Sequence, residues 1–348
     1  MPFASRRSLM PHQKQRRRTR PDLRAPLSGI AILLLVGFAL LSLPNILANE
    51  VRVATREPEK PPFPVSVDPI NETISESAEV DALFGETSGT LEAAASVASG
   101  AVVWLANLVA SVPGYAQIAG SDITFIDIKS GYREEEVARA FGLALGWTKA
   151  EQEAFLEQVH ETDPELTEGE FVPGIYMVSS AASASYVQEL LNDRFERDVA
   201  SRYSPEAERV LPLEDVLTIA SLLQRETRDP SEMRLISGII WNRLWSGMNL
   251  QIDATLQYAK ANKGGTKTWW PTPRPADKYI KSPYNTYQNE GLPPGPIANP
   301  STEAILAALN PKKTDCLFYF HDRRGDMHCS PDYQGHVKLL KKYYGQGR

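Results

Sequence analysis

The feature that most constrains this chain is an uncharged apolar run of about twenty residues, 27–47, rich in Leu, Ile, Val and Ala. A helix of that length is enough to cross a hydrocarbon core of about 30 Å. We therefore predict a transmembrane helix over residues 27–48. A buried core helix is one alternative, but it rarely lacks charge for so long. A cleaved signal peptide is the other, and the long basic region before the run together with a weak cleavage site at Ala48 favours an uncleaved anchor.

The charge of the chain is divided unevenly around this run. Residues 1–26 hold eight Lys or Arg side chains against one acid, Asp22, and carry a net charge of +7. Because the whole chain has a net charge of −6, residues 27–348 carry −13. Basic flanking residues stay on the cytoplasmic side of a span. We therefore predict a single-pass protein of the cytoplasmic membrane, with a basic cytoplasmic tail and an extracytoplasmic body. The acidic body excludes a nucleic-acid-binding class, since phosphate contacts need clustered basic residues.

Residues 49–120 are predicted to be a linker. Its first part is rich in proline and its second part, 71–90, is acidic and rich in Ser and Thr, which is typical of chains with little fixed structure. A second apolar stretch follows at 93–112. If it crossed the membrane, the C-terminal body would return to the cytoplasm, but its Ala, Val and Ser content and its Asn107 disfavour insertion. We expect a packed or interfacial helix with Trp104 and Leu105 on its apolar side.

From residue 121 the hydrophobic pattern becomes that of a compact α+β unit. A strand is predicted at 123–128, and a second strand, with a turn, at 171–178. Helices are predicted at 133–145, 147–159 and 186–200. We assign residues 121–205 to this small subdomain and its connecting helix.

The candidate catalytic residue lies on the next predicted helix, 213–227. Apolar residues from Val216 to Leu223 recur at helical spacing, and at about 100° per residue Glu226 falls within the same apolar arc. A carboxyl on an apolar stripe is either paired structurally or held in a desolvated pocket, where its pKa rises and it can act as a general acid. The residue pattern alone leaves both interpretations open.

A second apolar helix is predicted directly after the first. Asp229-Pro230-Ser231-Glu232 has the pattern of a capping box with proline at the first helical position, and the apolar pattern that follows ends at Gly247. If the two helices pack together, Glu226 lies near their short connection. The positive end of the second helix then favours the ionised form of this carboxyl.

Two cysteines, Cys316 and Cys329, flank a predicted β-hairpin. An aromatic segment precedes the turn-like stretch 322–326, so a hairpin centred near Arg323 places the cysteines roughly opposite each other. An extracytoplasmic compartment permits a disulfide. Two buried free thiols are the alternative, because the sequence does not set the strand register.

The same region carries residue types that suggest ligands. His321, His328 and His336, together with the cysteines, could indicate zinc, but their spacing matches no tight ligand pattern. We therefore predict no metal and no cofactor. The pair Trp269-Trp270, in a stretch rich in Pro and Lys, either stacks on sugar rings or covers the edge of the core.

Several ordered motifs occur between the predicted catalytic helix and the cysteine hairpin. They are Ala220-Ser221-Leu222-Leu223-Gln224-Arg225-Glu226-Thr227, Asn242-Arg243-Leu244, Leu250-Gln251-Ile252-Asp253-Ala254-Thr255, Tyr284-Asn285-Thr286-Tyr287 and Gly291-Leu292-Pro293-Pro294-Gly295. On these motifs, residues 121–344 resemble the YceG-like endolytic murein transglycosylases (MltG). The resemblance implies an α+β fold with a small LysM-like subdomain followed by a mixed α/β catalytic domain, which we place at 206–348.

The resemblance also implies site residues. The family's usual pattern is Ala-Ser-x-x-Glu-x-Glu-Thr, whose first glutamate is Gln224 here and whose second falls on Glu226. Glu226 is then the only acid of the motif and the implied catalytic residue. Ala254 stands where the family usually has proline, which puts the placement of the preceding aspartate in question. The residues expected to bind substrate are Gln251, Asp253, Thr255, Asn285, Thr286, Tyr287 and His328.

The implied reaction cleaves the β-1,4 bond between N-acetylmuramic acid and N-acetylglucosamine without water. One carboxyl can serve both steps, as general acid and then as general base. An ordinary glycoside hydrolase needs a second carboxylate, for which Asp253 is the candidate. A hydrolytic muramidase and a noncatalytic peptidoglycan-binding scaffold are therefore the alternatives. The expected partners are the peptidoglycan glycan strands, the cytoplasmic membrane and peptidoglycan synthases, and the expected role is to terminate strand elongation.

Overall fold

The computed structural model describes residues 24–55, 60–85, 102–109, 111–112, 123–162 and 168–345. The chain divides into two compact units, Met1–Leu43 and Pro44–Arg348. Helix α1 (Arg24–Thr55) begins in the first unit and ends in the second.

The predicted transmembrane helix falls on α1. Among the described residues, no helix combines the length and the apolar character that crossing a membrane requires. The side chains of residues 24–34 and the whole of residues 1–23 lie outside the described part of the chain. The predicted span and the predicted basic tail therefore remain predictions.

Residues 60–85 are folded onto the larger unit. Strands β1 (Val67–Asp68) and β2 (Thr73–Ile74) pair antiparallel, and helix α2 (Ala78–Gly85) follows. Four apolar side chains of this segment are buried in the main core: Phe63, Val67, Val80 and Phe84. The prediction of little fixed structure is wrong here. The segment is polar on average, but these four apolar residues reach the same hydrophobic core.

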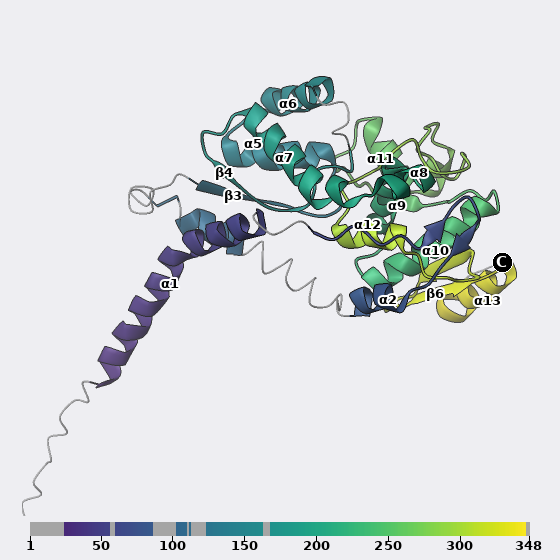
Figure 1. Cartoon of the computed structure of the whole chain (residues 1–348), viewed down its shortest axis with the longest axis horizontal. Helices are drawn as coiled ribbons and strands as arrows, with labels where there is room; N and C mark the ends of the chain where they lie inside the picture. Colours follow the sequence, from purple (N-terminus) through teal and green to yellow (C-terminus); the bar gives the residue numbers. More distant parts are fainter. Residues whose placement is uncertain are drawn as a thin grey trace, which may run out of the picture. The chain divides into compact units, whose positions relative to one another are not determined.

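The small α+β unit has the predicted order of elements. They are β3 (Ile123–Ile128), α5 (Glu134–Leu145), α6 (Lys149–Thr162), β4 (Gly174–Ser179) and α7 (Ala184–Asp198). The two strands pair antiparallel, with Ile126 opposite Tyr176, and the helices gather beside them (Figure 1). Apolar side chains of both strands and all three helices share one core. The predicted likeness to a LysM module stays a prediction.

A short helix over residues 102–109 lies against the first strand of this unit. The side-chain amide of Asn107 donates to Phe125 O (2.7 Å) and accepts from Phe125 N (2.9 Å). The polar residue that disfavours membrane insertion thus extends the edge of the sheet. Trp104, expected on the apolar side, is 65% exposed, whereas Val103 and Ala106 are buried. Residues 93–101 of the predicted helix lie outside the described part.

The rest of the larger unit is mostly helical. Its helices are η1 (Ala200–Arg202), α8 (Pro205–Val210), α9 (Leu213–Glu226), α10 (Pro230–Trp245), α11 (Asp253–Asn262), η2 (Pro275–Tyr279) and α12 (Thr302–Leu309). Helix α9 contacts α10, α11 and α12, and every residue from Val216 to Leu223 is buried. A helix buried on all sides belongs to the centre of a core. The two predicted helices on either side of Thr227 are confirmed.

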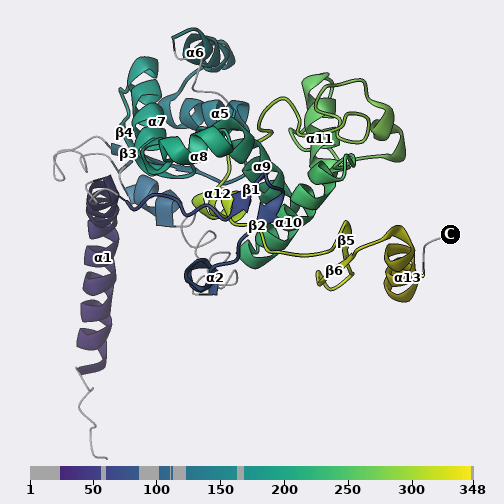
Figure 2. The same ribbon diagram turned by 45° about the vertical axis from the view of Figure 1, so that its right-hand side comes forward.

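A β-hairpin and a helix form the C-terminal end of this unit. Strands β5 (Phe318–His321) and β6 (Met327–Ser330) pair antiparallel, and α13 (Tyr333–Tyr344) follows. In Figure 2 the β3–β4 sheet lies on one side of α10, and the hairpin and α13 lie on the other. The predicted hairpin around Arg323 is confirmed.

Asn299 joins the small unit to the helical part. Its side-chain oxygen accepts from Gly169 N (3.0 Å) and Phe171 N (2.9 Å), and its side-chain nitrogen donates to Tyr132 O (2.9 Å) and Glu168 Oε1 (3.1 Å). The Asn299 side chain is fully buried. One amide therefore satisfies backbone groups in the β3–α5 connection and in the α6–β4 connection of the small unit.

Candidate active site

The centre of the candidate site is Glu226, the last residue of α9. The helix ends there because Thr227 is extended, with φ −149° and ψ 166°. The Glu226 side chain leaves the buried helix and meets the hairpin, where the Tyr319 hydroxyl donates a 2.8 Å hydrogen bond to Glu226 Oε2. This confirms that the carboxyl points toward a partly buried environment.

Opposing effects act on the ionisation of Glu226. Burial raises the pKa of its carboxyl above the usual value, and the negative charge of Asp253 acts in the same direction. The hydrogen bond from Tyr319, the second-largest influence after burial, lowers the pKa, as do the positive charges of His321 and Arg225. A carboxyl with a raised pKa keeps a proton closer to neutral pH, as a general acid requires.

Tyr319 and His321 reach the site from one face of strand β5, because alternate side chains of a strand share a face. His321 Nε2 lies 3.3 Å from Glu232 Oε2, and Glu232 Oε2 also accepts from the Thr227 hydroxyl at 2.6 Å. Tyr344 of α13 donates to His321 O at 2.5 Å. The connection between α9 and α10 is thus tied to the hairpin that carries Tyr319.

A second carboxylate, Asp253, lies near Glu226 at the start of α11. The Tyr287 hydroxyl donates to Asp253 Oδ1 at 2.7 Å. Burial and this contact with Asp253 raise the pKa of Tyr287, so the phenol stays protonated and keeps donating. Asp253 is exposed, whereas Glu226 is partly buried. The two carboxyls therefore sit in different environments, each with one tyrosine donor.

Gln251 has an unusual backbone conformation beside Asp253. Its φ is +52°, and among the described residues only Glu72 is another non-glycine with positive φ. Its N–H donates to Thr286 O at 3.0 Å, and its side chain is exposed. Left-handed backbone at a non-glycine residue persists only where the surroundings hold it. The loop that presents Asp253 is held by the loop that presents Tyr287.

Three residues expected to bind substrate lie underneath this surface. Thr255, Asn285 and Thr286 have at most 1% of their surface exposed. The hydroxyls of Thr255 and Thr286 are 2.9 Å apart, and Thr286 Oγ1 accepts from Ile252 N at 3.0 Å. Asn285 Oδ1 accepts from Tyr287 N at 3.0 Å. The sequence predicts that these three side chains contact substrate directly. The structure differs from this prediction, because buried side chains that are hydrogen-bonded within the chain present no surface to a ligand.

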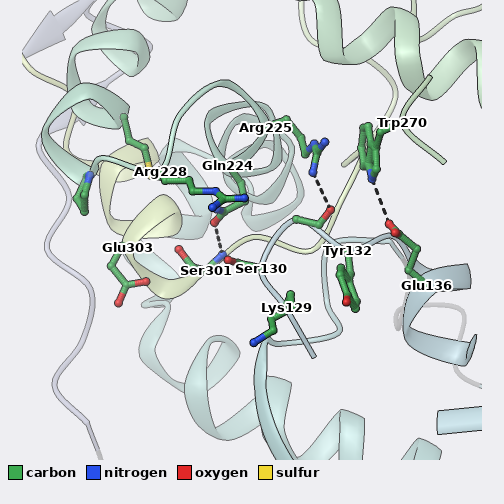
Figure 3. Close-up of a pocket in the computed structure, with 13 residues that line it drawn as sticks. Lys129, Ser130, Tyr132, Glu136, Gln224, Arg225, Arg228, Trp270, Ser301 and Glu303 are labelled. Atoms are coloured by element: carbon green, nitrogen blue, oxygen red, sulfur yellow. Dashed lines mark hydrogen bonds between the residues drawn. The ribbon is translucent and has the colours of Figure 1, made fainter. Parts of the chain in front are cut away.

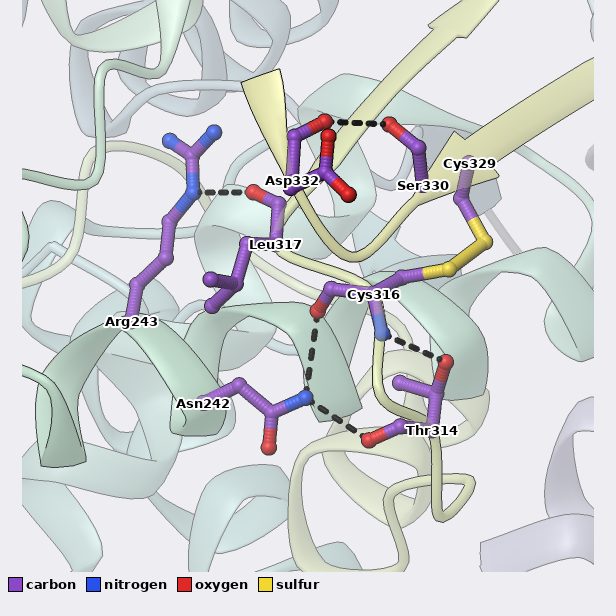
Figure 4. Close-up of a disulfide and its surroundings, with 8 residues drawn as sticks. All are labelled: Asn242, Arg243, Thr314, Cys316, Leu317, Cys329, Ser330 and Asp332. Atoms are coloured by element: carbon purple, nitrogen blue, oxygen red, sulfur yellow. Dashed lines mark hydrogen bonds between the residues drawn. A yellow bond between two sulfur atoms is a disulfide. The ribbon is translucent and has the colours of Figure 1, made fainter. Parts of the chain in front are cut away.

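The Asn242-Arg243 pair of α10 holds the framework of the site (Figure 4). Arg243 Nε donates to Leu317 O at 2.7 Å and its Nη1 to Leu250 O. Asn242 Nδ2 donates to Thr314 O (2.8 Å) and Cys316 O (3.1 Å). Arg243 is 7% exposed. The two side chains therefore connect the loop before Asp253 to the strand that carries Tyr319.

His328 lies on the other face of the hairpin from Glu226. It pairs with Phe320 across the strands, whereas Tyr319 pairs with Cys329, so Tyr319 and His328 point to opposite faces. The His328 ring stacks on Tyr343 at 4.0 Å between centroids. His328, expected to bind substrate, therefore does not face Glu226, whereas His321 lies on the same face of β5 as Tyr319.

The two cysteines form a disulfide, which decides between the alternatives left open above. Cys316 and Cys329 are 5.8 Å apart at Cα and joined through their sulfurs (Figure 4). The bond closes the base of the hairpin, beside the hydrogen bond from Leu317 N to Ser330 O. It links the strand of Tyr319 to its partner strand.

Gln224, which replaces the first glutamate of the family pattern, points away from Glu226. Its Oε1 accepts from Ser301 N at 2.9 Å, at the start of α12. A glutamate could accept the same bond, so the substitution keeps this contact and removes a negative charge. Sequence reasoning did not identify Tyr319, His321 and Glu232 as neighbours of the acid. These three residues lie in a short hairpin and a helix cap, where the sequence pattern gives little indication of a functional site.

Comparisons with known proteins found similar sequences and a similar structure. A model of the YceG-like family matches residues 102–342. An endolytic murein transglycosylase of Streptococcus pneumoniae is 28% identical over 222 residues, covering 57% of this chain and 40% of the relative. One of Bacillus subtilis is 38% identical over 128 residues, covering 37% of this chain and 34% of the relative. The chain thus spans less than half the length of these relatives.

A solved structure shows a similar fold. The crystal structure of a putative YceG-like protein from Listeria monocytogenes superposes with a TM-score of 0.52 at 26% identity, covering 62% of this chain and 75% of that one. Its fold supports the mixed α/β architecture of the larger unit. Because the family model matches most of the sequence, including every element of the candidate site, this chain belongs to the YceG-like family.

Proposed function

We propose that this chain is a membrane-anchored endolytic lytic transglycosylase of peptidoglycan. The observation that carries the proposal is Glu226, a partly buried carboxyl with a raised pKa that accepts a hydrogen bond from Tyr319. The names of the pneumococcal and Bacillus relatives support the same reaction class. The substrate is the β-1,4 bond between N-acetylmuramic acid and N-acetylglucosamine.

Glu226 performs both proton transfers of the proposed reaction. Its protonated carboxyl gives the proton to the glycosidic oxygen while the bond from that oxygen to C1 of the muramoyl residue breaks. The C6 hydroxyl of the same sugar then forms a bond to C1, and the Glu226 carboxylate takes the hydroxyl proton. The products are a free N-acetylglucosamine hydroxyl and a 1,6-anhydro muramoyl end, and no water is consumed.

Tyr319 and Asp253 tune the same carboxyl in opposite directions. Tyr319 donates to the ionised form that exists between the two steps, whereas the negative charge of Asp253 favours the protonated form that starts the reaction. An acid that must also act as a base benefits from both influences, since neither form becomes too stable to react. Tyr319 is therefore assigned to the positioning and tuning of Glu226.

Three residues around Glu226 are proposed to contact the glycan. Asp253 and Gln251 are exposed, and Tyr287 is partly buried and donates to Asp253. Thr255, Asn285 and Thr286 are assigned a positioning role, because they hold the loops beside the acid from below. His328 is not assigned to the glycan, since it faces α13.

A hydrolytic muramidase is the second candidate function, because a second carboxylate lies near Glu226. The negative charge of Asp253 raises the pKa of Glu226, so a second carboxylate lies near the acid, and a hydrolase uses two carboxyls. Its hydrogen bond from Tyr287 and its exposure are compatible with activating a water molecule. The two reactions differ by one water in the mass of the product.

The cellular setting is proposed from the sequence. The apolar run 27–48 anchors the chain in the cytoplasmic membrane, and the basic tail keeps the N-terminus in the cytoplasm. The catalytic unit then works on glycan strands near the outer face of this membrane. Cleavage of nascent strands there terminates their elongation, beside the peptidoglycan synthases.

The test is to incubate purified peptidoglycan with the detergent-solubilised full chain and with its Glu226→Gln variant, and to weigh the products by mass spectrometry. Anhydro-muramoyl ends from the wild type alone establish the reaction and its acid together. Hydrated ends assign the muramidase reaction and a role for Asp253. Equal cleavage by the variant, or no cleavage by a folded wild type, overturns the proposed function.

A further inference from the structure

A cavity lies beside the last turn of helix α9, next to the residues that precede Glu226. It has a volume of about 540 Å³ and is lined by the turn after β3, the last turn of α9, the starts of α10 and α12, and Trp270 (Figure 3). The proposed reaction uses none of its residues. A volume of this size is within the usual range for small-molecule sites, roughly 300–1,000 Å³.

The cavity is close to the proposed catalytic acid. Gln224 and Arg225 line it and directly precede Glu226 in α9. Successive helical side chains are about 100° apart, so the cavity lies around the helix from the carboxyl. A helix with its side chains is about 10–12 Å across. A ligand attached to a sugar at Glu226 therefore needs an arm of only a few residues, since an extended chain spans about 3.3–3.6 Å per residue.

One side of the cavity carries two charged groups that the fold does not use. Arg228 is exposed and Glu303 is partly buried, and neither has a hydrogen-bond or ion-pair partner within the part of the chain that the structure describes. In Figure 3 both lie on the left of the cavity, across from Trp270 and Glu136. An arginine and a glutamate left free at one cavity offer separate positions for a carboxylate and an amino group.

The opposite side of the cavity is rigid. The Arg225 guanidinium lies 3.6 Å from the centroid of the Trp270 ring and donates to Gly131 O at 3.3 Å. Trp270 Nε1 in turn donates to Glu136 Oε2 at 3.1 Å. A Cβ at Gly131, whose φ is +80°, would lie 3.1 Å from Arg225 Nη1, so glycine leaves room for this contact. The wall is preorganised before any ligand enters.

Gln224 adds a neutral polar group to the floor of the cavity. Its Oε1 is occupied by Ser301 N, which leaves its amide NH₂ as a donor. A glutamate at this position would place a negative charge beside Arg228 instead. The floor of this chain therefore offers a donor to a ligand carbonyl or carboxylate, in addition to the guanidinium of Arg228.

We propose that this cavity binds the peptide attached to the N-acetylmuramic acid residue whose bond is cleaved at Glu226. The proposal rests on the proposed function and names a part of its substrate. Such a peptide carries carboxylates and an amino group, which match Arg228 and Glu303, and it begins on the sugar that Glu226 protonates. A bare glycan carries a lactoyl carboxylate on each N-acetylmuramic acid but no amino group, so it leaves Glu303 unmatched and the observations favour the peptide.

The first test measures peptide binding directly, without catalysis. A soluble stem tetrapeptide with a free C-terminal carboxylate and one free side-chain amine is titrated into the detergent-solubilised full chain by calorimetry. Arg228→Ala and Glu303→Gln should each weaken binding by about tenfold, the size expected for losing one charge-assisted hydrogen bond. Arg139→Ala, which removes an exposed arginine of α5 outside the cavity, is the matched control and should bind as the wild type does.

The second test compares cleavage of glycan strands that carry peptides with the same strands after an amidase has removed them. The wild type should have a kcat/KM about tenfold higher on peptide-bearing strands, and both cavity variants should bring this ratio toward one. No peptide binding, equal binding by the cavity variants, or equal competition by acetate alone overturns the proposal. Cleavage of both strands at equal rates overturns it while leaving the proposed function intact. If neither kind of strand is cleaved, the proposed function is wrong, and the calorimetry alone then shows whether the cavity binds the peptide.

Discussion

Tyr319 and Glu226 are 93 residues apart in the sequence, and the Tyr319 hydroxyl donates a 2.8 Å hydrogen bond to Glu226 Oε2. The phenol arrives on strand β5, and the carboxyl leaves the end of α9. Because the donor stabilises the carboxylate while burial and Asp253 stabilise the carboxylic acid, the ionisation of Glu226 depends on parts of the chain that only the fold brings together.

Tyr319→Phe should shift the pH dependence of cleavage upward. The hydrogen bond from Tyr319 lowers the pKa of Glu226, so its removal raises that pKa and keeps the acid protonated to higher pH. The basic limb of the profile of kcat/KM against pH should therefore move to higher pH. The rate at the optimum should fall by about tenfold or more, since a charge-assisted hydrogen bond is lost. An unchanged profile in a folded variant contradicts the assigned tuning role.

Asp253→Asn should shift the same limb in the opposite direction. The negative charge of Asp253 raises the pKa of Glu226, so the neutral amide lowers it and the acid loses its proton at lower pH. Tyr287→Phe is the control, because it removes the donor to Asp253 without removing the charge. The profile is measured for all three proteins on one substrate. A transglycosylase should keep its anhydro product in both variants, whereas a muramidase should lose nearly all activity in Asp253→Asn.

Asn299→Ala should destabilise the junction between the small unit and the helical part. The substitution leaves the buried N–H groups of Gly169 and Phe171 without their acceptor. Each unsatisfied buried group costs about 1–3 kcal/mol, so a loss of about 3 kcal/mol is expected. Thermal unfolding should show Tm lowered by several degrees. Asn192→Ala, on the exposed face of α7, should leave Tm within about one degree, and an equal effect of both variants would count against the junction.

Removing the disulfide should loosen the hairpin that carries Tyr319 and His321. The bond closes a separation of 13 residues, for which chain-entropy estimates give about 3 kcal/mol. Cys316→Ser, Cys329→Ser and the double variant should lower Tm by similar amounts, because either single change breaks the bond. Their kcat should fall together with Tm, since Tyr319 is held by the hairpin. A single variant as stable as the wild type would contradict the pairing.

The sequence by itself determined many of the elements and the position of Glu226. The periodicity of 213–227 places Glu226 at the end of an apolar helix, and the capping pattern at Asp229 sets the start of the next one. The small unit follows its pattern element by element, because its apolar residues recur at the period of each helix or strand. These features depend on residues close together in the sequence, so a short segment is enough to predict each of them.

Tertiary structure decided which residues surround the acid. Tyr319 and His321 share a face of β5 only once the hairpin register is set, and that register moves His328 to the other face. Thr255, Asn285 and Thr286 look like wall residues in the sequence, but packing buries them beneath the loops of Asp253 and Tyr287. Residues 60–85 look unstructured by composition, yet they reach the main core. In each case the contact that sets a residue's position joins segments far apart in the sequence. Burial, strand register and hydrogen bonding at such contacts depend on the whole fold.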